Sequence, residues 1–118
     1  MVPILRTAAI VGTLVFCAPV CAQVYVTGTG TLKCSDWLKA REDGHGAQVD
    51  LNIQWIAGFA VGHNYYAERS KQVIVDLNDI RFATDKFCRD TPLATLMLAA
   101  AQYVQDAGGA MASHNKKR

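Results

Sequence analysis

The chain has 118 residues, 51% of them hydrophobic and 19% charged, and its formal net charge is +2 at pH 7. This length is enough for one small domain, and the near balance of charge excludes the basic stripe that nucleic-acid-binding proteins carry. We therefore expect a single folded unit that has no nucleic-acid partner.

Residues 1–22 have the layout of a secretory signal peptide. Arg6 is followed by a short apolar run, and small residues then lead to Ala22. We expect cleavage after Ala22, secretion across the inner membrane and a periplasmic location. Lipidation of Cys21 or Cys17 is the alternative, but the bulky Val20 and Phe16 do not suit the position before a lipidated cysteine.

Cys34 and Cys88 are the cysteines that remain after residue 22. A pair of cysteines in an exported protein favours a disulfide over reactive thiols. Closing so long a loop removes unfolded-state entropy equivalent to about 4 kcal/mol, which is large for a domain of roughly 100 residues. We expect this bridge to decide whether the chain folds.

The first predicted elements are an extended lead-in and a short helix. Residues 23–33 combine β-forming side chains with glycines, which favours an extended conformation. Ser35 is a good N-cap for a helix that runs to Arg41 or Glu42. The Gly-His-Gly sequence at 44–46 should end this helix.

A second helix is predicted from Asp50, as its N-cap, to about Glu68. Apolar residues cover most of its circumference, so it should be surrounded on most sides. Its uncharged stretch, 51–67, is shorter than the ~20 apolar residues that a bilayer requires, and we expect no membrane span. Gly58 and Gly62 indicate either close approach of the fourth helix or tolerance of a crowded neighbour.

The sequence QVIVDL at 72–77 has β propensity but no partner strand of useful length, so we expect a crossing connection. Asp76 or Asn78 should then cap a third helix. Its predicted inner face comprises Ile80, Ala83, Phe87 and Cys88. Its predicted outer face comprises Arg81, Asp85, Lys86 and Arg89.

A fourth helix is expected to begin with Thr91 as N-cap and Pro92 at its first position, and Gly108 should stop it. Its apolar stripe comprises Leu93, Leu96, Met97, Ala100, Tyr103, Val104 and Ala107. Residues 109–118 end in Lys-Lys-Arg and should form a flexible basic tail. The predicted fold is an all-α, four-helix orthogonal bundle over 34–108, cross-linked by one disulfide.

No catalytic motif is found in the chain, because no serine lies in a nucleophile elbow and no pair of carboxylates suggests a glycosidase. We expect no enzyme activity, no cofactor and no metal. His63 could bind a metal beside Cys34 and Cys88, but a hydrogen bond to a tyrosine or a carbonyl is the better interpretation. Trp37 and Trp55 favour core positions over a ligand cage.

Three segments in a fixed order resemble a known family. They are Cys34-Ser-Asp-Trp37-Leu, Trp55-Ile-Ala-Gly58-Phe59-Ala-Val-Gly62-His-Asn64 and Phe87-Cys88-Arg-Asp-Thr-Pro92-Leu. With the alanine-rich helix that follows, they resemble the small exported bacterial proteins grouped with the HdeA/HdeB acid-stress chaperones, over about 32–104. The resemblance implies a periplasmic helical protein whose disulfide, here between Cys34 and Cys88, joins the start of the first helix to the end of the third.

The function that this resemblance implies is that of a holdase. Such chaperones are folded dimers at neutral pH that loosen in strong acid and hold unfolding periplasmic proteins, so a homodimer is expected. Below about pH 3 carboxylates become neutral while Lys, Arg and His stay charged, and self-repulsion rises. The residues expected to form the apolar client or partner surface, or else the core, are Trp37, Trp55, Ile56, Phe59 and Tyr66.

A second hypothesis is a specific interaction protein, such as an immunity protein that neutralises a toxin in the periplasm. Small disulfide-linked helical immunity proteins of the Rap/Tai type are broadly similar, although they usually carry additional cysteines. One tight partner at neutral pH would distinguish this function from the holding of many clients.

Overall fold

The computed structural model describes residues 26–109, and these contain four α-helices and no strand. The all-α prediction is confirmed. The predicted signal peptide and the tail residues 110–118 lie outside the described residues. The elements in chain order are η1 (Gly28–Thr31), α1 (Cys34–Glu42), α2 (Gly46–Tyr66), η2 (Arg69–Lys71), α3 (Leu77–Asp90) and α4 (Leu96–Asp106), where η denotes a short 3₁₀ helix.

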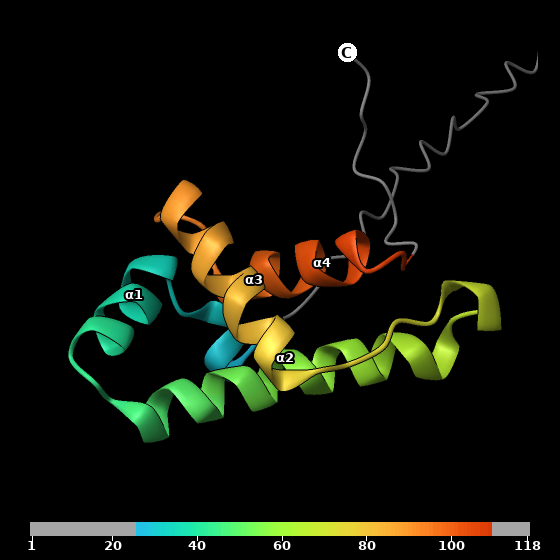
Figure 1. The fold of residues 1–118 in the computed structure, drawn as a ribbon, viewed down its shortest axis with the longest axis horizontal. Coiled ribbons are helices and arrows are strands. Elements are labelled where there is room, and N and C mark those ends of the chain that lie inside the picture. Colours follow the sequence, from blue (N-terminus) through green and yellow to red (C-terminus); the bar gives the residue numbers. More distant parts are fainter. Residues whose placement is uncertain (1–25, 110–118) are drawn as a thin grey trace, which may run out of the picture.

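The long helix α2 runs along one side of the molecule, and α3 crosses it steeply while α4 packs on both (Figure 1). The short helix α1 contacts α2 and α3. A single core fills the space between the helices, as expected for one small domain. Its largest fully buried apolar side chains are Trp37, Ile53, Ile56, Ile80, Leu96 and Val104.

The start of α2 differs from the prediction. The helix begins at Gly46, so Asp50 lies one turn inside it and does not cap it. Gly44 has φ +71°, a left-handed conformation that glycine adopts at little cost, and it reverses the chain between the two helices. Gly46 therefore belongs to the second helix, although we expected it to end the first.

The start of α4 also differs, because the helix begins at Leu96 and not at Pro92. The backbone of 91–95 bonds to the start of α1: Cys34 N–H donates to the Ala94 carbonyl over 2.8 Å, and Leu96 N–H donates to the Leu32 carbonyl over 2.9 Å. These bonds between distant segments replace the first helical turn. Leu93, expected in the apolar stripe, is 83% exposed.

The lead-in prediction is wrong for residues 28–31, which form η1. Gly30 is buried, and the ring of Trp55 lies directly against it where any side chain would project. The start of α1 is shifted as well, since Lys33 is its N-cap residue and Ser35 is inside the helix.

The crossing connection is confirmed for residues 72–76, whereas Leu77 is already the first residue of α3. Asn64 on α2 holds it with two hydrogen bonds of 2.8 Å, donating from Nδ2 to the Val73 carbonyl and accepting from the Val73 N–H. The Tyr103 hydroxyl on α4 donates to the Ile74 carbonyl over 3.1 Å. Side chains thus satisfy the backbone groups that a partner strand would otherwise bond.

His63 forms the type of hydrogen bond that we expected. Its Nε2 lies 3.0 Å from the Lys71 carbonyl, and because a carbonyl only accepts, this nitrogen carries the hydrogen. A side chain on Gly109 would come within 2.9 Å of the same nitrogen, so Gly109 packs closely on the folded part.

The interpretation of Gly58 and Gly62 as close-packing positions is wrong, because a Cβ built at either one meets nothing within 4 Å. Both glycines are exposed. The fourth helix does contact α2, and the residues buried on α2 include Ala57 and Ala60 but neither glycine.

Two glycine substitutions should therefore have opposite effects on stability. Gly58→Ala should raise the free energy of unfolding by up to about 1 kcal/mol, because alanine is the better helix former in open space. Gly30→Ala should lower it by about 1–3 kcal/mol, because the new methyl group displaces the Trp55 ring. Urea titration at pH 7 measures both, and effects of the same sign would contradict this packing.

Candidate functional site

The predicted disulfide is present. Cys34 and Cys88 are both fully buried, and their sulfur atoms are 2.08 Å apart. Cys34 is the first residue of α1, and Cys88 lies in the last turn of α3. The bridge therefore fixes how these two helices lie against each other.

The five residues expected to form an apolar surface or core fall into three environments. Trp37 and Ile56 are fully buried in the core. Trp55 and Phe59 are half-buried, with ring centroids 6.1 Å apart in a stacked arrangement. Tyr66 is 88% exposed and lies outside the core. The structure therefore does not bring these five side chains together as one surface.

A polar cluster lies next to the disulfide, at the junction of α1 and α3. Asp85 accepts a hydrogen bond of 2.9 Å from Trp37 Nε1. Arg41 donates to the same carboxylate through Nε over 3.1 Å and through Nη2 over 2.9 Å. The hydrogen bond to Asp85 raises the pKa of Arg41, so the guanidinium stays charged.

Asp85 is only 8% exposed, so the prediction that it faces water is wrong. It is the one charged side chain among the buried residues of 26–109. The physical reason is helical spacing: Trp37 follows Cys34 by three residues and Asp85 precedes Cys88 by three, which places each pair on one helix face. Combining that spacing with the predicted disulfide would have placed Trp37 beside Asp85.

An acid-sensitive contact is exposed at the end of α1. Lys39 Nζ lies 2.7 Å from Asp43 Oδ2, and this hydrogen bond is the main cause that lowers the pKa of Asp43. A lowered pKa means that the contact stabilises the fold above the ordinary value of 3.8 and is lost as the pH falls through the lowered value. Because both groups are solvated, this contribution is small.

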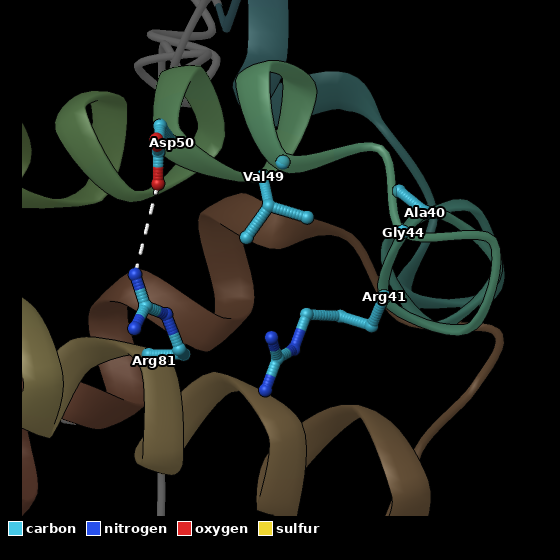
Figure 2. A pocket seen from close by; sticks show the side chains of 7 residues that line it. Ala40, Arg41, Gly44, Val49, Asp50 and Arg81 are labelled. Carbon is cyan, nitrogen blue, oxygen red and sulfur yellow. Dashed lines mark ion pairs between the residues drawn. The ribbon is translucent and has the colours of Figure 1, made fainter.

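A hollow of about 130 Å³ lies beside the cluster, between the α1–α2 turn and α3 (Figure 2). Its walls include Arg41, Gly44, Val49, Asp50 and Arg81. Arg81 Nη2 is 3.6 Å from Asp50 Oδ1, which is an ion pair but not a hydrogen bond. Sequence reasoning missed this hollow because it made Asp50 a helix cap and Arg81 a solvated side chain.

Among residues 26–109 no group of three or more His, Cys, Asp or Glu side chains is placed to hold a metal ion. None of the helices in that part of the chain is long and apolar enough to cross a membrane. No family model, curated protein or solved structure matches this chain.

The Asp85 cluster makes a direct prediction for stability at neutral pH. Asp85→Asn keeps the shape of the side chain but removes the charge that Arg41 binds, so the free energy of unfolding should fall by about 2 kcal/mol or more. The matched control is Asp90→Asn on the same helix, since Asp90 is exposed. Urea unfolding followed by tryptophan fluorescence measures both, and equal effects of the two substitutions would contradict the assigned role of Asp85.

Proposed function

We propose that this chain is a periplasmic holdase-type chaperone that exposes apolar surface in strong acid and holds unfolding proteins. The observation that carries the proposal is the buried Asp85 carboxylate, which joins α1 to α3 through Trp37 and Arg41. Export through a signal peptide at residues 1–22 is part of the proposal.

Acid acts on the charge of the whole chain. In strong acid carboxylates become neutral while Lys, Arg and His stay charged, so the net charge rises. Self-repulsion then favours an opened state, in which α1 separates from α3. The exposed Lys39–Asp43 contact at the end of α1, which lowers the pKa of Asp43, is lost as the pH falls through that lowered value.

The disulfide limits how far the chain can open, because Cys34 and Cys88 remain bonded when the non-covalent contacts are lost. Separation of α1 from the rest uncovers Trp37 and the core residues beneath it. Trp55 and Phe59 are already partly exposed at neutral pH, so they add to this apolar area. A covalently closed chain with uncovered aromatic side chains is suited to binding other unfolding chains.

The resemblance to the HdeA/HdeB chaperones supports the same function. Its first segment contains Cys34 and Trp37, and its last contains Cys88, so the residues that carry it lie at the junction of α1 and α3. The family also implies a homodimer at neutral pH that loosens in acid. The clients would be unfolding periplasmic proteins.

The test is an aggregation assay with an acid-denatured client, followed by light scattering from pH 7 to about pH 2. The chain should lose fixed tertiary structure reversibly and suppress client aggregation in acid but not at pH 7. In Asp85→Asn, tertiary structure should be lost at a higher pH and protection should begin there too. An unrelated protein of similar size is the control, and a chain that opens without protecting the client would refute the proposal.

One observation favours the second candidate, a specific protein-binding or immunity protein. Tyr65 and Tyr66 are 81% and 88% exposed at the end of α2, with ring centroids 4.9 Å apart. Exposed aromatic side chains are typical of the central contacts in protein interfaces. On this hypothesis the partner binds at neutral pH.

A pair of alanine substitutions separates the two functions. If a single partner binds at pH 7, Tyr65→Ala with Tyr66→Ala should weaken its binding by about tenfold or more. The same variant should keep its protection of clients in acid, because the uncovered core lies elsewhere. Binding of one partner that is unchanged in this variant would exclude the tyrosine pair as its contact.

A further inference from the structure

Basic side chains follow the two exposed tyrosines at the end of α2. The helix ends at Tyr66, and the short helix η2 comes next with Arg69 and Lys71, which are both exposed. Neither of these basic side chains forms an ion pair among residues 26–109. Glu68 is the one acidic residue in this segment of the sequence. The end of α2 therefore combines exposed aromatic rings with basic groups that no acidic partner neutralises.

The chain beyond Gly109 starts at the same end of the molecule. Helices α2 and α4 run toward this end (Figure 1), and a Cβ built on Gly109 would lie 2.9 Å from Nε2 of His63, in the last turn of α2. Residues 110–118 include three basic residues, 116–118, and no acidic one. Because a chain of this length spans at most about 30 Å, its three charges stay within that distance of Gly109.

The basic residues of the chain are thus concentrated at one end. This end has five basic residues, two in η2 and three at 116–118, against two acidic ones, Glu68 and Asp106. The rest of 23–118 has six basic residues against eight acidic ones. A nearly balanced total charge therefore hides a positive end on an otherwise negative chain, and this end will be attracted to an anionic partner.

Tyrosine rings next to basic residues match an anionic membrane surface. Tyrosine favours the head-group level of a bilayer, and Lys and Arg near the surface are attracted to anionic lipids. Binding scales with the apolar area that is buried and with this attraction, and the end of α2 offers both. Basic residues at the rim of a protein interface mainly change the rate of association, whereas each one adds to the binding of an anionic lipid surface.

We propose that the end of α2, together with the basic residues 116–118, binds the surface of an anionic membrane. The rings of Tyr65 and Tyr66 lie among the lipid head groups, and the side chains of Arg69 and Lys71 contact lipid phosphates. This binding takes place at neutral pH and does not depend on the holdase function.

The test is co-sedimentation at pH 7 with two kinds of vesicle: phosphatidylcholine alone, and phosphatidylcholine with the anionic lipid phosphatidylglycerol at about 2:1. The exported, disulfide-bonded protein is used, and its mass must show that residues 1–22 are gone, because their apolar run would bind lipid by itself. We expect binding to the anionic vesicles only, and this binding should weaken as salt is added.

Arg69→Gln with Lys71→Gln should weaken binding to the anionic vesicles by about tenfold or more, since each basic residue contributes about fivefold. The matched control is Lys86→Gln with Arg89→Gln on α3, where both side chains are exposed. It changes the net charge by the same amount, and its binding should stay within about twofold of the unsubstituted protein. An equal loss in both variants would overturn the proposal.

Tyr65→Ala with Tyr66→Ala tests the aromatic part without changing any charge. Binding to the anionic vesicles should fall by about fivefold or more, because less apolar area enters the head-group region. Equal binding of the unsubstituted protein to both kinds of vesicle, or to neither, would overturn the proposal. A tyrosine variant that loses a protein partner but keeps full vesicle binding would overturn it as well, in favour of the second candidate function.

Discussion

The disulfide between Cys34 and Cys88 is the constraint on which the rest of the structure depends. It fixes the start of α1 against the end of α3, and the helical repeat then carries Trp37 toward Asp85. Arg41, one turn further along α1, reaches the same carboxylate. One covalent bond and one buried charge thus lie along a single contact between two helices.

This arrangement divides the contact into a covalent part and a non-covalent part. The disulfide persists when other contacts are lost, whereas the Asp85 carboxylate joins the two helices through three hydrogen bonds that can break. Well-packed apolar side chains in place of both Asp85 and Arg41 would give an equally stable junction at neutral pH, whereas removal of either one alone is destabilising. The two helices are therefore held by one bond that cannot open and one contact that can, and the proposed holdase function requires this combination.

The polar side of α1 continues from this junction into the hollow. Arg41 belongs to both, because its guanidinium binds Asp85 and its side chain also lines the hollow together with Gly44. The tight turn at Gly44 brings the start of α2 next to α3, which places Arg81 under an uncapped helix end. A short connection between two helices thus forms one wall of this hollow.

Features that depend on neighbouring residues could be predicted before the fold was known. Asp76 accepts hydrogen bonds from the Asn78 and Asp79 amides at the start of α3, and Gly108 has the positive φ expected just beyond α4. The disulfide and the crossing connection also followed from composition and spacing. Only the tertiary structure decided that α4 begins at Leu96 and that Asp85 is buried. The reason is separation along the chain. The start of α4 bonds to the backbone at 32–34, and Asp85 bonds to side chains of α1, with 44 residues between Arg41 and Asp85.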